Sequence, residues 1–233
     1  MTLATAKPHA PRALTRPDAI IFDMDGTLLD TEAVHHRAQT ETARAMGLDL
    51  PPAIHRTFVG VHHEVNNRTL RELWGEHADI AGFNESADAL FDALWRQSIP
   101  LKPGARTLLE NLNRNGIPLG LCTSTRSPNA QERLKTAGFL DLFSSVVTLN
   151  DVENPKPHPE PYLLSARRLD ADPARSIVVE DSPNGLRAAA AAGMTVLLVP
   201  DLIAPTPETQ ALAHTVLPDL DAVGAWLETL LVT

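Results

Sequence analysis

One stretch near the N-terminus, AIIFDMDGTLLDTE at residues 19–32, decides the fold. Its first four residues are apolar, and the run ends at Asp23. A short run that is apolar at every position predicts a strand covered on both faces, as in a parallel sheet. Asp23 and Asp25 are two residues apart, so an extended backbone carries both carboxylates on one side. The stretch therefore predicts a buried strand that delivers acidic side chains at its carboxyl end.

Similar apolar runs recur along the chain and alternate with helical patterns. Several of the helical patterns stop at glycine, the usual residue just past a helix end. Strands that alternate with helices at this spacing predict a doubly wound parallel sheet of the α/β class. Further strands are expected at 117–122, 145–149, 177–179 and 195–199, and helices at 105–115, 129–137, 160–169, 184–192 and 219–231.

The segment between the first and second predicted strands breaks this alternation. It shows helical patterns at 31–46, 62–74 and 86–97 and no convincing strand. A helical block in that place predicts an inserted cap domain, with hinges near 28–31 and 99–104. We therefore divide the chain into a disordered tail at 1–17, a core at 18–30 and 100–233, and a helical cap at 31–99.

Composition places the chain of 233 residues among soluble globular proteins, with 43% hydrophobic residues and a net charge of −9. No apolar stretch approaches the roughly 18 residues that a membrane-spanning helix needs. An acidic chain has no overall field that attracts nucleic acid. The single cysteine, Cys122, excludes an intramolecular disulfide. We expect a cytoplasmic monomer that acts on a small molecule, with a frayed N-terminus rather than a targeting segment.

Acidic and hydroxyl side chains gather at the predicted strand ends. Asp23 and Asp25 follow the first strand, Thr123 follows the second, and Glu180 and Asp181 follow the fourth. Ligands of open α/β sheets bind outside the carboxyl ends of the strands, so these groups are expected to converge. Two close carboxylates raise each other's pKa unless a cation lies between them. Oxygen ligands in this number favour Mg²⁺.

The order of these residues resembles the motifs of the haloacid dehalogenase superfamily of phosphotransferases. Residues 23–32 (DMDGTLLDTE) resemble its first motif, Thr123 its second, Lys156 its third, and residues 180–185 (EDSPNG) its fourth. The helical insertion after the first motif is similar to the helical cap of this superfamily. The resemblance therefore implies a Rossmann-like core with an inserted α-helical cap, and an enzyme that transfers phosphoryl groups.

The resemblance also implies a role for each residue of the acidic cluster. Asp23 is expected to be the nucleophile, which takes the phosphoryl group as an aspartyl-phosphate. Asp25 is expected to protonate the leaving oxygen and then to activate water. Mg²⁺ is expected on Asp23, on the backbone carbonyl of Asp25 and on Asp181, with Glu180 bound through a water. The ion lets an anionic carboxylate approach an anionic phosphate.

A phosphoryl group needs hydrogen-bond donors and positive charge as well. The resemblance implies that Thr123 donates a hydrogen bond to a phosphate oxygen and that Lys156 supplies a compact positive charge. Backbone amides near Gly26 and near Ser124 are expected to add further donors.

Asp25 favours phosphate ester chemistry, because dehalogenases of this superfamily carry no acid at the second position of the pair. Two groups remain similar to this chain: phosphatases of small sugars or phosphoglycolate, and β-phosphoglucomutases. His35 stands where the mutases have a histidine on the first cap helix, but His63 stands where they have the arginine that grips a distal phosphate. Arg126 is a further candidate for binding a phosphate.

We therefore expect a phosphatase for a small phosphorylated metabolite. Mutase-type phosphoryl transfer and a non-catalytic module that binds a phosphate ligand are the alternatives. The cap, through His35 and His63, is expected to choose the substrate.

Overall fold

The structure is a computed structural model that describes residues 15–58, 61 and 63–231. Within these residues, a six-stranded sheet forms the centre, in the order β3-β2-β1-β4-β5-β6, and every neighbouring pair is parallel. The doubly wound α/β fold predicted from the sequence is thus confirmed. The strands are β1 (Ala19–Phe22), β2 (Leu119–Cys122), β3 (Ser145–Val147), β4 (Ser176–Glu180), β5 (Thr195–Leu198) and β6 (Thr215–Val216).

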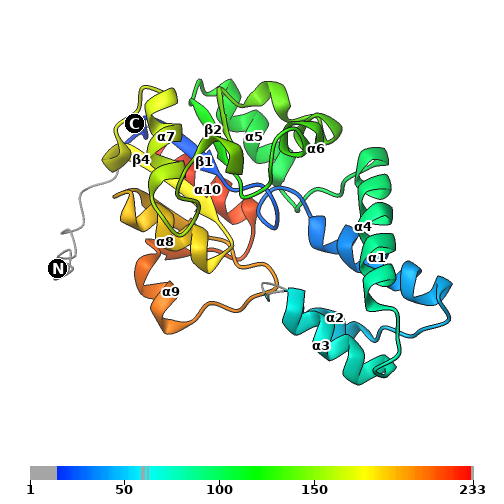
Figure 1. The fold of residues 1–233 in the computed structure, drawn as a ribbon. Coiled ribbons are helices and arrows are strands. Elements are labelled where there is room, and N and C mark those ends of the chain that lie inside the picture. Colours follow the sequence, from blue (N-terminus) through cyan, green and yellow to red (C-terminus); the bar gives the residue numbers. More distant parts are fainter. Residues whose placement is uncertain (1–14, 59–60, 62, 232–233) are drawn as a thin grey trace.

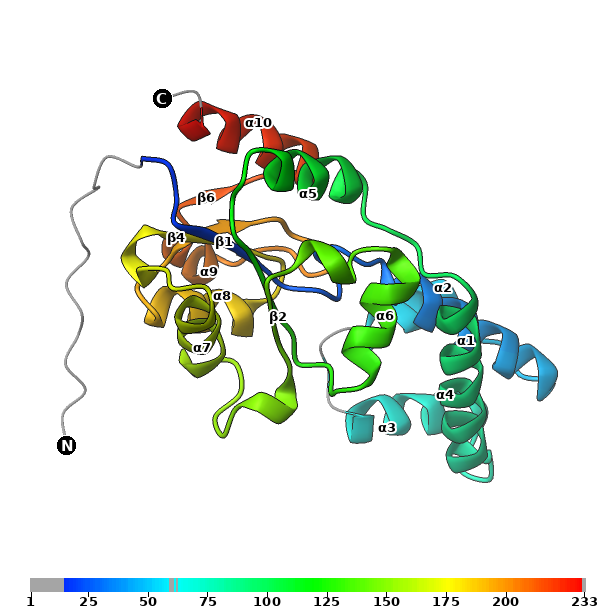
Figure 2. The same cartoon turned by 90° about the horizontal axis from the view of Figure 1, so that it is seen from above.

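Helices cover both faces of the sheet, as Figure 2 shows. Successive residues of a strand point to opposite faces, and in β1 both sets are fully buried. Ile20 and Phe22 pack with α5, α6 and α10, whereas Ile21 packs with α7 and α8. The helices of the core are α5 (Ala105–Arg114), α6 (Asn129–Ala137), α7 (Glu160–Arg168), α8 (Pro183–Ala191), α9 (Pro207–Leu212) and α10 (Leu220–Leu231).

The four helices that the structure describes between β1 and α5 extend away from the sheet (Figure 1). They are α1 (Thr31–Ala45), α2 (Pro52–Arg56), α3 (His63–Trp74) and α4 (Ile80–Gln97). Their far part has its own apolar cluster, which includes Leu50, Leu70 and Phe83. Phe91 and Trp95, near the end of α4, pack instead into the apolar cluster of the core. This helical unit therefore has a core of its own and is also anchored on the main body.

The two chain segments that join the helical unit to the sheet run side by side. The Asp30 amide donates to the Pro100 carbonyl, and the Lys102 amide donates to the Leu28 carbonyl, both at 2.9 Å. Leu29 forms an antiparallel bridge with residue 101 between these two bonds. The predicted hinges near 28–31 and 99–104 thus lie together, a few residues after Asp25, whereas the domain boundaries themselves stay predictions.

Several elements differ from the expected ranges, each for a local reason. Helix α4 begins at Ile80 rather than at 86, because the Asp79 side chain caps the helix by accepting from the Gly82 amide. Strand β3 ends at Val147, because residues 149–151 form a 3₁₀ turn. Helix α2 and strand β6 were not expected; they have five and two residues, too few to show a period.

Two further expectations concern the N-terminal tail and membrane-spanning helices. Most of the predicted tail at 1–17 lies outside the described residues, as do residues 59, 60 and 62 just before His63. In the part of the chain that the structure describes, no helix is both long and apolar enough to cross a bilayer.

Candidate active site

The site lies where β1, β2 and β4 end, at the carboxyl edge of the sheet. Asp23 follows β1, and its amide still donates to the Val179 carbonyl of β4 at 3.0 Å. Thr123 follows β2, and its amide donates to the Val147 carbonyl at 2.9 Å. Glu180 is the last residue of β4. Because parallel strands end at one edge, the predicted convergence of these residues follows from the sheet.

Lys156 connects three of the predicted motifs from a buried position. Its Nζ lies 2.6 Å from Asp23 Oδ1 and 2.7 Å from Glu180 Oε1, and its side chain is 5% exposed. It also donates to the Cys122 carbonyl at 3.0 Å. Burial opposes its charge, but the two carboxylates outweigh burial and raise the pKa of Lys156 above its ordinary value. The cation therefore stays protonated beside Asp23.

Asp23 is a buried carboxylate with a shifted proton affinity. Burial raises its pKa to about 7, with Lys156 lowering the pKa and the charge of Glu180 raising it. Only 8% of the surface of Asp23 is exposed. Such a carboxylate is held in one place by Lys156 and is poorly hydrated. These are the conditions under which a carboxylate oxygen can attack a bound electrophile.

Glu180 supports its neighbours with both carboxylate oxygens and is 0% exposed. Oε1 accepts from Lys156 and, at 2.9 Å, from the Tyr162 hydroxyl. Oε2 accepts from the amides of Asp181 at 3.0 Å and Ser182 at 2.8 Å. In this arrangement Glu180 fixes Lys156 and the start of α8. Its expected contact with a metal ion through a water stays a prediction.

Two glycines let these carboxylates approach the backbone closely. Gly26 has a φ of +90°, and a Cβ there would lie 2.5 Å from Asp181 Oδ2. A Cβ on Gly185 would overlap Glu180 Oε1. The Gly26 amide donates to the Leu29 carbonyl at 2.9 Å. In this conformation the Gly26 amide therefore closes its own turn, and the expected phosphate donors near Gly26 stay a prediction.

Asp181 has the surroundings of a cation ligand. Its Oδ1 accepts from the Thr27 hydroxyl at 2.9 Å, so the carboxylate lies against the turn that follows β1. Burial and the charges of Glu180 and Asp23 raise its pKa well above the ordinary value. Among the described residues, no three histidine, cysteine or acidic side chains meet closely enough to hold a metal ion. The donor chemistry nevertheless fits Mg²⁺, because a cation relieves the repulsion between the buried Asp23 and the half-buried Asp181 carboxylates and prefers oxygen ligands.

We expect Mg²⁺ to bind more tightly as the pH rises from 6 to 8. The ordinary pKa of Asp23 is 3.8 and the folded value is about 7, so at pH 6 a proton competes with the ion for this carboxylate. Asp181 shifts in the same direction. The rise in unfolding temperature that Mg²⁺ produces measures the binding. It should be larger at pH 8 than at pH 6.

Replacing Asp181 by alanine should reduce the Mg²⁺ effect at both pH values. Asp141→Ala is the matched control. It removes an exposed acid from the domain that contains the sheet and should leave the Mg²⁺ effect intact. An Mg²⁺ effect that is equal at pH 6 and pH 8 would contradict the raised pKa values as its cause.

Asp25 follows β1, but its carboxylate contacts the segment that follows β2 rather than Lys156. Its Oδ2 accepts from the Thr125 hydroxyl at 2.7 Å and from the Thr123 hydroxyl at 3.4 Å. Its Oδ1 lies 3.0 Å from Arg133 Nη1, a cation of helix α6. Asp25 and Thr123 were expected at the site from the sequence, whereas Thr125 and Arg133 were not.

The remaining predicted residues are more exposed than this cluster. Ser124 and Arg126 are exposed on the loop after Thr123, and His63 is exposed at the first position of α3. His35 on α1 stacks on Phe91, with ring centroids 3.6 Å apart and planes at 12°. Burial lowers the pKa of His35 to about 4, so its ring is neutral at pH 7. The expected roles of these residues in binding substrate stay predictions.

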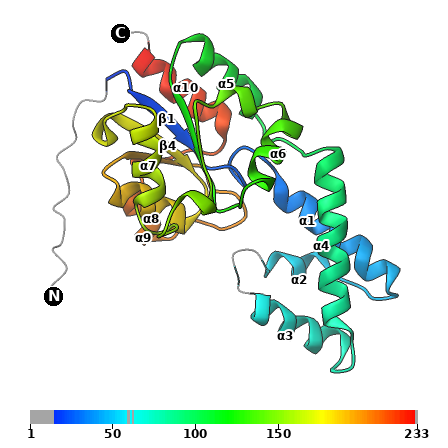
Figure 3. The same cartoon turned by 45° about the horizontal axis from the view of Figure 1, so that its top comes forward.

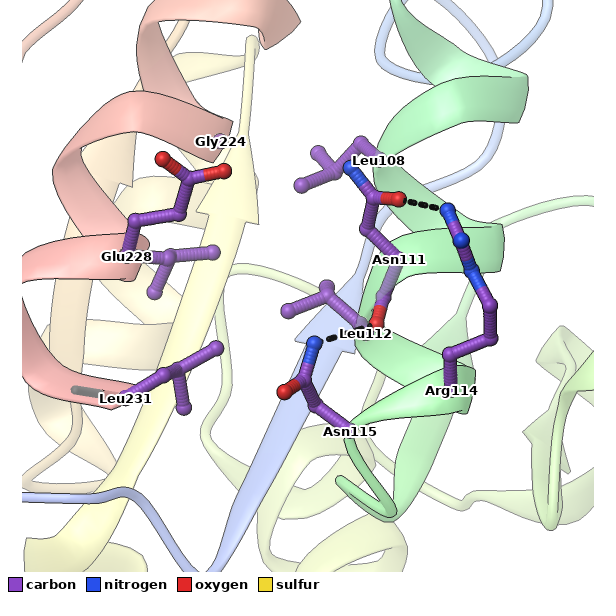
Figure 4. A pocket seen from close by; sticks show the side chains of 9 residues that line it. Leu108, Asn111, Leu112, Arg114, Asn115, Gly224, Glu228 and Leu231 are labelled. Atoms are coloured by element: carbon purple, nitrogen blue, oxygen red, sulfur yellow. Dashed lines mark hydrogen bonds between the residues drawn. The ribbon is translucent and has the colours of Figure 1, made fainter.

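A hollow of about 300 Å³ between α5 and α10 lies away from this cluster (Figure 4). The hollow lies at the end of α5 from which the chain enters β2. Because β2 begins at the amino edge of the sheet, the hollow lies at that edge as well. Several of its polar groups already bond to one another at the end of α5. The side chain of Asn111 accepts a hydrogen bond from Arg114, and the Asn111 carbonyl accepts one from the Asn115 side chain at 2.8 Å. The described residues that line it bring no acid, base and nucleophile together, and we place the functional site at the carboxyl edge.

Comparison with known proteins identifies the family of the chain. A family model described as haloacid dehalogenase-like hydrolase matches residues 20–199. A phosphorylated carbohydrates phosphatase of Thermotoga maritima is 33% identical over 177 residues, which is 76% of this chain and 82% of that protein. Hexitol phosphatase A of Escherichia coli is 36% identical over 186 residues, 79% and 83% of the two chains.

A solved structure adds a ligand to the comparison. A mutant of CbbY from Rhodobacter sphaeroides, in complex with xylulose 1,5-bisphosphate, superimposes with a TM-score of 0.66 and 32% identity. The match covers 88% of this chain and 95% of that one.

Proposed function

Because the chain belongs to the haloacid dehalogenase-like hydrolase family, we propose that it is a magnesium-dependent phosphatase. It acts on a small phosphorylated metabolite through an aspartyl-phosphate. The observation that carries the proposal is the buried contact of 2.6 Å between Asp23 Oδ1 and Lys156 Nζ at the end of β1. It places a nucleophilic carboxylate next to a cation that can meet phosphoryl oxygens.

The reaction has two steps, and Asp25 serves both. In the first, an oxygen of Asp23 bonds to phosphorus while the bond from phosphorus to the leaving oxygen breaks. The electron pair of that bond stays on the leaving oxygen, and Asp25 donates a proton to it. In the second, a water oxygen bonds to phosphorus, Asp25 takes the proton of that water, and Asp23 is released as a carboxylate. Lys156 and the Thr123 hydroxyl bind the phosphoryl oxygens in both steps.

Asp23, Asp181 and the backbone carbonyl of Asp25 would hold the magnesium ion, with Glu180 joined through a water. When bound, the ion lets the anionic carboxylate approach the anionic phosphate ester. The raised pKa values of Asp23 and Asp181 support this assignment, since both carboxylates gain from a nearby cation.

We propose a sugar phosphate or a phosphoglycolate-type compound as the substrate class. The names of the two phosphatase relatives, which concern phosphorylated carbohydrates and hexitols, support the sugar class. The neutral ring of His35 suits a hydroxyl partner, and the exposed His63 and Arg126 are further candidates for contacts with substrate. Mutase chemistry ranks second, because His63 stands where mutases carry an arginine. Cytoplasmic location and a monomeric state stay predictions.

The test is a phosphate-release screen of phosphorylated sugars, phosphoglycolate and related metabolites, with Mg²⁺ and with EDTA. We expect release from at least one of them that depends on Mg²⁺ and is absent in EDTA. Conversion of glucose 1-phosphate to glucose 6-phosphate, measured in parallel, distinguishes a mutase. Phosphate ligands that bind without any turnover would point to the non-catalytic module instead.

A further inference from the structure

Arg133 is a buried cation that the proposed reaction does not use directly. It lies on α6, and its side chain is 10% exposed. Its Nη1 lies 3.0 Å from Asp25 Oδ1 and 3.4 Å from the Thr125 hydroxyl oxygen. The Thr125 hydroxyl in turn donates to Asp25 Oδ2 at 2.7 Å. Each oxygen of the Asp25 carboxylate therefore has its own partner, which fixes the orientation of that carboxylate.

The other side of Arg133 faces the helical cap. The central carbon of its guanidinium lies 5.0 Å from the ring centroid of Phe91 and 5.4 Å from that of Trp95. Both rings belong to α4, which lies beside α6 (Figure 3). Cations within about 6 Å of an aromatic face are attracted by it. The orientation of the guanidinium thus depends on how α4 packs against α6.

The stability of the fold does not explain why Arg133 is buried. Its Nε is buried without a hydrogen-bond partner in the described part of the chain. Against the two aromatic rings of α4, an apolar side chain of similar volume would avoid the cost of removing a charge from water. What an apolar side chain does not provide is the charge-assisted bond to Asp25.

We propose that Arg133 is a positioning residue that orients Asp25 and takes its own orientation from the cap helix α4. The packing of the cap on the core and the placement of the acid are thereby linked through one side chain. This inference rests on the proposed function, because it matters only if Asp25 delivers a proton to the leaving oxygen.

The signature of such a role is a dependence on the leaving group. Phenyl phosphate leaves as a phenol-type oxygen, whose pKa near 10 calls for a proton donor at pH 7. The leaving group of 2,4-dinitrophenyl phosphate is a far weaker base and departs as an anion. Both esters carry a phosphoryl group on a phenyl ring, and they differ only in the two nitro groups. A misplaced Asp25 should therefore lower kcat/KM for the first ester and hardly affect the second.

The experiment measures kcat/KM for both esters in the wild type and in Arg133→Gln. We expect a loss of about tenfold to a hundredfold for phenyl phosphate, part of what a positioned acid contributes. For 2,4-dinitrophenyl phosphate we expect little change. In Arg133→Gln combined with Asp25→Asn, the loss for phenyl phosphate should equal that of Asp25→Asn alone, because both variants act on one group.

Further variants separate positioning from structural support. Phe91→Leu removes a ring beneath Arg133 and should show the same selectivity in weaker form, and Arg133→Lys should lie between the wild type and Arg133→Gln. Lys135→Gln, an exposed position on α6, should leave both esters unchanged. If Arg133→Gln does not fold, as judged by its unfolding temperature, Phe91→Leu and Arg133→Lys carry the test.

Equal losses for the two esters, or additive losses in the double variant, would overturn the inference and leave the phosphatase assignment standing. A wild-type protein that hydrolyses neither ester and releases no phosphate in the metabolite screen would overturn the proposed function itself.

Discussion

Replacing Asp23 by asparagine is expected to abolish phosphate release, with a loss of at least about 10⁴-fold in kcat. The amide has no anionic oxygen to form a bond with phosphorus, and Asp25, the other acid that follows β1, is paired with Arg133. The acyl phosphate should disappear as well. Rapid quenching in acid followed by mass spectrometry should find a phosphorylated peptide that contains Asp23 in the wild type and none in the variant.

The matched control is Asp18→Asn, the same chemical change just before the amino end of the same strand. Asp18 is paired with Arg175 on the surface, at 2.7 Å, and lies away from the carboxyl edge. We expect near wild-type turnover. Activity of Asp23→Asn close to that of the wild type would exclude the covalent mechanism, provided that the protein is free of contaminating phosphatase and that its new amide has not deamidated back to aspartate.

Replacing Lys156 by methionine is expected to reduce both turnover and stability. Breaking a buried ion pair on one side typically costs about 3–5 kcal/mol, since the partner charges remain buried. The loss of positive charge also raises the pKa of Asp23 above about 7, so less of the nucleophile is ionised at pH 7. With the lost contact to the phosphoryl group, kcat should fall by about 10²–10³-fold. Denaturant unfolding and steady-state kinetics measure the two effects.

A second variant separates the structural effect from the chemical one. Lys156→Met combined with Glu180→Gln removes a charge from each side of the buried contact, and should recover part of the lost stability but none of the activity. Lys135→Met, at an exposed position, should change neither quantity by more than a small amount. An unaltered unfolding free energy in Lys156→Met would show that Lys156 does not compensate the buried carboxylates.

Some features of the fold were predictable because they depend on local patterns. The sequence shows the four-residue apolar run at β1 and the glycines that follow the helices. These patterns predicted the parallel sheet. Helix α2 and strand β6 were missed because two to five residues show no period. Helix α4 was predicted too short, because the cap at Asp79 depends on a bond to one amide.

The site divides in a similar way. The places of Asp23, Asp25 and Asp181 after strands were predictable, because residue type and order are properties of the chain itself. Lys156 was identified only through the family resemblance, and the roles of all four residues stay predictions. Arg133 left a faint signal that was not used: it is a cation on the helix face that otherwise carries buried alanine and leucine, at Ala130, Leu134 and Ala137. Nothing in its spacing from Asp25, 108 residues away, indicates their contact.

The sequence by itself thus determined the parallel α/β core, the helical insertion and the acidic residues at the strand ends, because apolar periodicity and strand-end positions are local and repeat along the chain. Only the tertiary structure decided how those residues share their hydrogen bonds. It assigned Glu180 to holding Lys156, closed the Gly26 amide within its own turn, and placed Arg133 between Asp25 and the rings of α4. These outcomes depend on which buried donors and acceptors come within about 3 Å of one another, and that is set by packing between distant segments rather than by local sequence.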